Sequence, residues 1–303
     1  MEYAQLTPGR GFAPLHSLLY YGQRFVTSRG MRRLIVAVLR TSIRLRQGSF
    51  RVNQPENDQD REILRALCND GYAPLPGLLS AAQIADIRAF FRSKSLVARP
   101  SHAARFTIDN VPEGVRMADY SLQDIIDAPH ILELANSPAL LRLAAAYIGC
   151  KPTLSALGLR WSFPGAEAGT DVQAFHRDSD DWRYMKILVY LTDVNDEAGP
   201  HVYIEGTHTV KAPLRLQLYD DTEIRQRYGE GRIIVATGNA GFGFAVDTSG
   251  IHKGAVPAKK PRLMLQIQYS LLPAYAYRYA PQPYGGSLVL DAYINRLFCI
   301  QRM

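Results

Sequence analysis

The sequence predicts an α+β protein in which helices precede an antiparallel barrel or jelly roll. Before Pro152, apolar residues recur mainly at helical spacing. After Pro152, short runs rich in Val, Ile, Leu and Tyr alternate with turns that contain Gly, Pro and Asp. Helices followed by many short strands are typical of α+β architectures, and a barrel or jelly roll accommodates such strands.

The N-terminal segment is strongly basic. Nine arginines and no Lys, Asp or Glu lie between Tyr3 and Pro55, and removing them from the net charge of +7 leaves −2 for the rest. Apolar residues recur here at helical spacing: Met31, Leu34, Ile35, Val38, Leu39 and Leu45. Four arginines fall largely on the other side: Arg29, Arg33, Arg40 and Arg44. We therefore predict a basic amphipathic helical arm over residues 1–55 and a main domain over residues 56–303.

Three interpretations of this arm remain open from the sequence. It is a helical extension packed on the body, a helix that contacts an anionic membrane surface through residues 24–46, or an Arg-rich transit or nucleic-acid segment. The longest apolar run, Leu34–Leu39, has six residues, against the about 20 that span a bilayer. The arginines alternate with aliphatic rather than stacking aromatic residues, which does not favour nucleic acid.

The main domain begins after a polar stretch, Asn53–Asp60, that is predicted to be a linker. Ser80 and Gln83 form a capping box that predicts the start of a helix. Other helices are predicted over Asp60–Cys68, Leu122–Ile126 and Ile131–Ile148. Strands are predicted over Ser155–Ser162, Tyr184–Leu191, Arg232–Thr237, Phe242–Val246 and Arg262–Leu271.

Cysteine usage argues against a zinc ribbon and against a disulfide framework. Cys68, Cys150 and Cys299 are far apart and form no CxxC pair. Buried free cysteines suit a reducing compartment, so we expect a cytoplasmic protein, with the membrane surface as an open alternative.

A His-x-Asp tripeptide is the first candidate for chemistry. Among seven histidines, only His176 has a carboxylate, Asp178, two positions later. In an extended strand residues i and i+2 point to the same face, so both side chains can reach one metal. The tripeptide alone is weak evidence, because it arises by chance in chains of this length.

A second histidine and an arginine strengthen this prediction. His252 follows two candidate strands, and Arg262 opens an apolar run ten residues later. Two histidines and one carboxylate on one face form the facial triad of non-haem iron(II) oxygenases, which leaves coordination positions open. A buried Arg suits the distal carboxylate of a 2-oxo acid, because its planar fork binds a carboxylate through two hydrogen bonds.

These residues resemble the phytanoyl-CoA dioxygenase-like family of 2-oxoglutarate oxygenases over about residues 64–272. The resemblance rests on Asp70-Gly71-Tyr72, Leu75–Ser80, His176-Arg177-Asp178, Leu191–Val194, Ala198-Gly199-Pro200, Glu205–His208, His252 and Arg262. It implies a double-stranded β-helix, a cupin-like jelly roll, with N-terminal and flanking helices. It also implies that Fe(II), 2-oxoglutarate and O2 are required and that succinate and CO2 are released.

The resemblance carries over to individual residues. It implies that His176, Asp178 and His252 hold the metal and that Arg262 binds 2-oxoglutarate. Gln173 before the metal strand, Tyr190 on the next strand and Gly254 after the distal histidine lie at its other cosubstrate positions. Gly254 stands where the family often has a Ser that contacts 2-oxoglutarate. Family halogenases replace the carboxylate by a small residue, so Asp178 favours a hydroxylase or desaturase.

Several functions remain open at this stage. The first is a dioxygenase that hydroxylates an unactivated C–H bond of a small-molecule or lipid-linked substrate. If the arm contacts membrane, the substrate becomes a glycolipid at the bilayer surface. A catalytically inactive cupin-like binding module would not need His176, Asp178, His252 and Arg262 together. A zinc hydrolase with the same ligands would give Arg262 no role.

Overall fold

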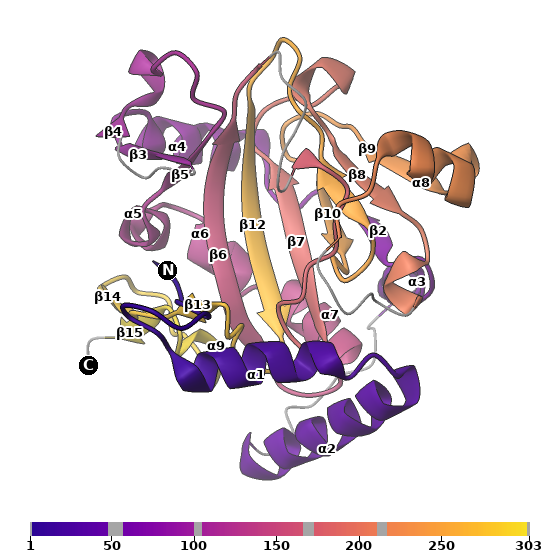
Figure 1. Cartoon of the computed structure of the whole chain (residues 1–303). Coiled ribbons are helices and arrows are strands. Elements are labelled where there is room, and N and C mark those ends of the chain that lie inside the picture. The colour runs from indigo at the N-terminus through magenta and orange to yellow at the C-terminus, as the bar shows by residue number, and fades with distance from the viewer. Residues whose placement is uncertain (1, 48–56, 100–104, 166–172, 211–216, 302–303) are drawn as a thin grey trace.

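The computed structural model describes residues 2–47, 57–99, 105–165, 173–210 and 217–301 (Figure 1). At its centre lies an eight-stranded antiparallel sheet in the order β2-β10-β7-β12-β6-β5-β3-β4. Its strands are β2 (Tyr72–Leu75), β3 (Leu96–Arg99), β4 (Arg105–Phe106), β5 (Met117–Tyr120), β6 (Thr153–Ser162), β7 (Tyr184–Tyr190), β10 (Gly243–Val246) and β12 (Arg262–Ser270). The strands predicted from residues 155, 184, 242 and 262 onwards are thereby confirmed.

A second, three-stranded sheet faces the inner side of the large sheet. It consists of β11 (His252–Gly254), β8 (His201–Ile204) and β9 (Ile233–Ala236), the last being the strand predicted near Arg232. Apolar side chains of both sheets fill the space between them, and the Tyr190 hydroxyl donates to the Ala236 carbonyl at 2.8 Å. The predicted fold class, an α+β protein with a double-stranded β-helix core, is confirmed.

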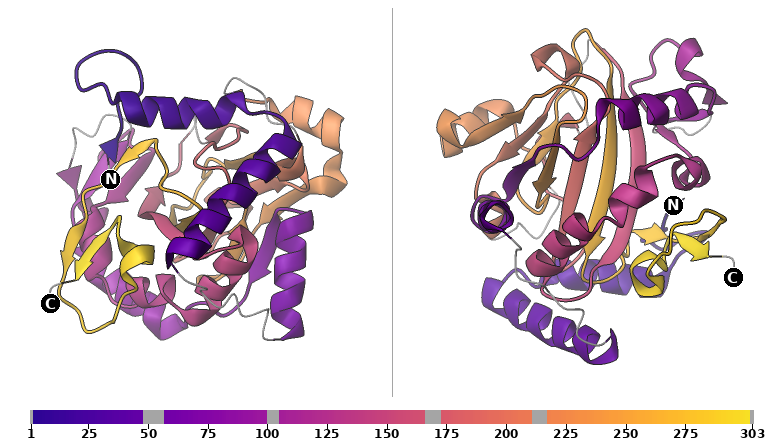
Figure 2. Two further views of the ribbon diagram at one scale, coloured as in Figure 1. Left: turned by 90° about the horizontal axis from the view of Figure 1, so that it is seen from below. Right: turned by 180° about the vertical axis from the view of Figure 1, so that it is seen from behind.

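Helices cover the outer face of the large sheet (Figure 2). They are α3 (Asp58–Asn69), α4 (Ala81–Arg92), α5 (Leu122–Asp127), α6 (Ile131–Ala135) and α7 (Pro138–Ile148). The capping box is present as predicted, with Gln83 N–H bound to the Ser80 hydroxyl and the Gln83 side chain bound to Ser80 N–H. The linker prediction was wrong at its end, because Asn57 caps α3 and residues 58–60 form its first turn.

The single helix predicted over Ile131–Ile148 is two helices. Ser137 accepts a hydrogen bond from Leu140 N–H and so starts α7 with Pro138 at its first position, where Pro lacks an N–H that would be unpaired anyway. By length and composition alone this stretch is apolar enough to cross a membrane. Half of it is buried in the protein, and its apolar side chains belong to the core that packs on the sheet.

Smaller elements complete the chain. Among the described residues they are α8 (Asp221–Tyr228), β13 (Tyr277–Arg278), β14 (Gln282–Tyr284), α9 (Ala292–Asn295), β15 (Cys299–Gln301) and 3-10 turns at Ile108–Asn110, Asp196–Ala198, Thr207–Thr209 and Glu230–Arg232. The N-terminal strand β1 (Glu2–Tyr3) pairs with β13. The first residues of the chain are therefore joined to the C-terminal part.

The basic arm forms two helices, α1 (Pro14–Phe25) and α2 (Arg29–Gln47), at one end of the molecule (Figures 1 and 2). The Gln23 side chain donates to the Ser179 carbonyl at 3.1 Å, and Arg32 donates to the Gln23 carbonyl at 2.7 Å. The helix predicted around residues 31–45 is present, but the side that meets the body differs from the predicted apolar face. Val36, Leu39 and Ile43 pack on the core, whereas Met31, Leu34, Val38 and Leu45 are exposed.

Gly199 offers a test of the turn that leads into β8. Its φ is +67°, and a Cβ there would lie 2.3 Å from the Ala255 carbonyl oxygen. We expect Gly199→Ala to lower the free energy of unfolding by about 2 kcal/mol or more, since left-handed backbone strain adds to the clash. Urea unfolding would measure this loss. Gly231→Ala is the control, because that position has open space and no positive φ; an equal loss in both variants would contradict the account.

Candidate metal and cosubstrate site

Backbone pairing brings the two predicted ligand segments together. His176 N–H donates to the His252 carbonyl at 2.9 Å, and His252 N–H donates back at 3.0 Å. Asp178 N–H donates to the Thr248 carbonyl at 2.9 Å. The strand expected at His176–Asp178 is reduced to this bridge, yet the pairing still aligns the two side chains with His252.

The ligand atoms of these three residues face one another. They lie within 4.8 Å of each other, with His176 Nε2 3.4 Å from Asp178 Oδ1 and His252 Nε2 3.5 Å from Asp178 Oδ2. Metal–ligand bonds of about 2.1 Å place neighbouring ligand atoms about 3 Å apart, so the group needs little adjustment to hold an ion. The residues therefore fit a mononuclear metal site.

The opposite ring nitrogens of both histidines are anchored to the backbone. His176 Nδ1 lies 2.8 Å from the Ala174 carbonyl, and His252 Nδ1 lies 3.1 Å from the Gly250 carbonyl. A carbonyl only accepts, so each Nδ1 carries the proton and each Nε2 keeps its lone pair for a metal. This orientation is typical of metal-binding histidines.

The pKa shifts of His252 and Asp178 favour the protonation states that a metal requires, whereas the shift of His176 opposes them. Burial lowers the pKa of His252 to about 3, with a further contribution from His176, so this imidazole is neutral at pH 7. Burial alone would raise the pKa of Asp178, but the charge of Lys186 holds it well below its usual range. For His176, burial lowers the pKa, but Asp178 outweighs it and the net shift is upward. Metal binding uses the neutral imidazoles and the carboxylate anion.

Lys186 lies beside the triad. Its buried ammonium contacts Asp178 Oδ2 at 2.6 Å and Asp180 Oδ2 at 3.2 Å. These contacts orient the Asp178 carboxylate, as groups around metal ligands commonly do. The sequence signal for Lys186 is a lone charge in the apolar strand 184–190.

Arg262, at the start of β12, is buried with unsatisfied donors. Nη2 donates to the Ser162 hydroxyl at 3.3 Å, while Nε and Nη1 have no partner among the described residues. Buried donors without acceptors are rare because leaving them unpaired costs about 1–3 kcal/mol or more. A carboxylate received by this guanidinium would satisfy them, so the site fits the distal carboxylate of 2-oxoglutarate.

The other predicted cosubstrate residues differ in what they offer. The Tyr190 hydroxyl bridges the sheets, accepting from His201 N–H at 2.9 Å and donating to the Ala236 carbonyl. Gln173 is buried and its amide nitrogen has no partner among the described residues. Gly254 pairs with His201 on β8 and offers only its backbone.

His201 was not assigned to the site from the sequence. Its ring stacks on that of His252 with centroids 5.4 Å apart, and its buried Nε2 lacks a partner among the described residues. Burial, together with the charge of Arg262, holds its pKa well below the usual value. His201 is therefore a neutral imidazole beside His252.

A jelly roll with two histidines and a carboxylate on its inner face is the arrangement of cupin-like non-haem iron oxygenases. The model of the phytanoyl-CoA dioxygenase family matches residues 67–254, and the chain belongs to this family. Membership confirms the predicted enzyme class, an oxygenase dependent on iron, 2-oxoglutarate and O2. No curated protein matches the chain in sequence.

Solved structures share the fold at low identity. The epimerase SnoN, in complex with Fe3+, alpha ketoglutarate and nogalamycin RO, is 21% identical with a TM-score of 0.50, covering 69% of this chain and 82% of SnoN. EctD from S. alaskensis, with 2-oxoglutarate and 5-hydroxyectoine, is 19% identical with a TM-score of 0.49, covering 82% and 89% of the two chains. The likeness to SnoN concerns the fold alone and leaves the substrate open.

Proposed function

We propose that this chain is a cytoplasmic dioxygenase that hydroxylates a C–H bond of a small-molecule or lipid-linked substrate. One substrate C–H bond, one O2 and one 2-oxoglutarate would give the alcohol, succinate and CO2. The unsatisfied donors of Arg262, buried in the same barrel as the His-Asp-His group, carry this proposal. A binding module or a hydrolase has no use for that guanidinium.

Each residue has a defined part in the proposal. His176, Asp178 and His252 would hold iron(II), which when bound supplies the activation of O2. Lys186 orients the Asp178 carboxylate, and Arg262 receives the distal carboxylate of 2-oxoglutarate. Gln173, Tyr190 and Gly254 would line the cosubstrate. The buried barrel interior excludes water from the reacting groups.

The experiment is to load purified protein anaerobically with ferrous iron and to measure three quantities: bound iron, bound 2-oxoglutarate, and succinate formed after O2 is admitted. Binding of both ligands with succinate formation would support the oxygenase. A protein that binds neither iron nor 2-oxoglutarate would refute the proposal and favour the binding module.

The exposed side chains of the arm favour a membrane-surface form of this function. On α1, Leu15, Leu18 and Phe25 are 64–70% exposed, and on α2, Leu34 and Val38 are each 61% exposed. Neither helix contains an acidic residue, and α2 is rich in arginine. Exposed apolar rows beside basic residues are typical of segments that lie on anionic bilayers. We propose that residues 1–55 form a membrane-contacting arm and residues 56–303 the oxygenase domain.

We expect the double variant Leu34→Gln/Val38→Gln to reduce sedimentation with anionic vesicles by at least about tenfold, since each buried apolar side chain contributes roughly 1.5–3 kcal/mol and Gln keeps the net charge and the helix. The control is Val289→Gln/Ile300→Gln, two exposed apolar positions outside the arm. Unchanged sedimentation of the α2 variant would contradict membrane contact through this helix.

A further inference from the structure

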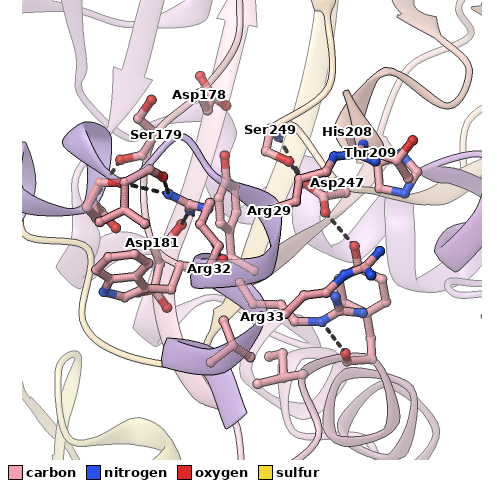
Figure 3. A pocket seen from close by; sticks show the side chains of 18 of the residues that line it. Arg29, Arg32, Arg33, Asp178, Ser179, Asp181, His208, Thr209, Asp247 and Ser249 are labelled. Atoms are coloured by element: carbon pink, nitrogen blue, oxygen red, sulfur yellow. Dashed lines mark hydrogen bonds between the residues drawn. The ribbon is translucent and has the colours of Figure 1, made fainter. Parts of the chain in front are cut away.

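A cavity of about 620 Å3 lies between part of the arm and the body. One wall is formed by α1, α2 and the turn between them. The other is formed by the segment around residues 178–184, the end of α7, and residues 247 and 249. Asp178 of the metal triad lines the cavity and His176 and His252 do not, so the space borders the candidate metal site at Asp178. Figure 3 shows Arg29, Arg32 and Arg33 around the cavity with Asp178, Asp181, Asp247 and Ser249.

Arginines dominate the charge of this cavity. Six line it, against three aspartates: Arg24, Arg29, Arg32, Arg33, Arg40 and Arg183 face Asp178, Asp181 and Asp247. The aspartates are engaged elsewhere. Asp178 contacts Lys186, Asp247 accepts from Tyr147 and Ser249, and burial raises the pKa of Asp181 to about 8, which keeps most of it protonated at pH 7. Within the described part of the chain, no ion pair joins Arg29, Arg33 or Arg40 to a carboxylate.

The geometry of α2 directs these charges into the cavity. At 3.6 residues per turn, Arg29, Arg33 and Arg40 form a row directly beside the row that packs on the core, while the exposed apolar row lies on the far side. Arg32 fixes this orientation. Its guanidinium donates to the Gln23 carbonyl and stacks 5.0 Å above the Trp182 ring. The helix is thereby held with its arginines over the space that leads to Asp178.

We propose that this cavity binds a phosphate or pyrophosphate group of the substrate and so holds the rest of that substrate toward the metal triad. Guanidinium groups bind phosphate oxygens through paired, charge-assisted hydrogen bonds, and several arginines without carboxylate partners suit a group with more than one negative charge. The volume falls in the range of about 300–1,000 Å3 typical of ligand pockets, which leaves room beyond the anion. The inference rests on the proposed oxygenase function, because it assigns the substrate class of that site.

The test compares two arginine pairs on the same helix. Arg29→Gln/Arg33→Gln removes two cavity charges, and Arg44→Gln/Arg46→Gln removes two charges from positions that do not line the cavity. Inorganic pyrophosphate is the probe, titrated calorimetrically at about 0.15 M salt, where exposed charges are largely screened. We expect the cavity pair to weaken pyrophosphate binding at least about tenfold and the other pair to change it less than about twofold.

Vesicles distinguish the source of the phosphate. If pyrophosphate displaces the wild-type protein from vesicles that contain phosphatidic acid, but does not displace the cavity variant, the phosphate belongs to a lipid headgroup. If pyrophosphate binds the wild type without displacing it from these vesicles, the phosphate belongs to a soluble phosphate ester. Equal pyrophosphate affinity in all three proteins, or equal losses in both variants, would overturn the proposal. Because this binding needs neither iron nor 2-oxoglutarate, absent succinate formation with intact pyrophosphate binding would mark failure of the oxygenase function instead.

Discussion

Replacing His252 by alanine is expected to abolish succinate formation and to weaken iron binding by at least about 100-fold. Loss of a group that merely supports a metal ligand costs about 10- to 100-fold in affinity, and loss of the ligand itself removes more. Without His252, only two of the three candidate metal ligands, His176 and Asp178, remain. Bound iron measured by a chelator assay, together with succinate formed from 2-oxoglutarate, reports both effects.

His130→Asn is the matched control for this variant. His130 also lies near carboxylates, 3.0 Å from Asp86 and 3.9 Å from Glu133, but no second histidine lies beside it among the residues that the structure describes. Its φ of 65° is tolerated by Asn, so the replacement should fold normally. Iron binding and succinate formation should match the wild type. Full iron binding by His252→Ala would refute the assignment of the metal triad.

The metal residues could be predicted from sequence because their spacing follows local rules. His176 and Asp178 are two positions apart on extended backbone, and the distal histidine stands ten residues before an arginine that opens a strand. The large strands could be predicted for the same reason, since β-branched and aromatic runs bounded by turn residues are local signals. The metal strand is only an isolated β-bridge in the structure. The side chains of His176 and Asp178 nevertheless face His252.

Strand parity could not be predicted, and this hid part of the site. Every residue of β7 is buried, so the strand shows no alternation of polar and apolar side chains. In the structure Ile187 and Val189 face the helices, whereas Leu188 and Tyr190 face the second sheet. Lys186 lies on the same face of β7 as Leu188 and Tyr190, and it therefore contacts Asp178. Only the tertiary arrangement reveals that contact.

The packing of the arm was also beyond sequence reasoning. The apolar residues of α2 occupy two rows, and hydrophobicity alone cannot tell which row meets the body. The structure selects the row of Val36, Leu39 and Ile43, with Arg32 stacked on Trp182. This choice leaves Leu34 and Val38 exposed and turns the arginines toward the cavity. The arginines of α2, whose pattern in the sequence suggested contact with lipids, therefore also line the candidate substrate site.

Replacing Arg262 by lysine is expected to raise the 2-oxoglutarate concentration required for half-maximal succinate formation by about 10- to 100-fold. Hydrogen bonds to charged groups are worth about 1.5–3 kcal/mol, and a lysine ammonium keeps the charge without the planar fork that pairs with both carboxylate oxygens. Because the loss concerns binding of the cosubstrate, saturating 2-oxoglutarate should recover most of the maximal rate. Iron binding should be unchanged, since Arg262 is not one of the residues that face the metal position.

Arg296→Lys provides the comparison. That guanidinium is also part-buried, donating to the Thr153 hydroxyl at 2.9 Å and lying over the Tyr293 ring, but it belongs to the C-terminal part of the chain. Both variants replace a planar guanidinium by an ammonium of the same charge. A difference between them in the 2-oxoglutarate requirement therefore reports a specific role of Arg262 at the cosubstrate site. An unchanged 2-oxoglutarate requirement in Arg262→Lys would mean that the unsatisfied donors of Arg262 serve another anion, and the cosubstrate assignment would have to move to a different cation of the barrel.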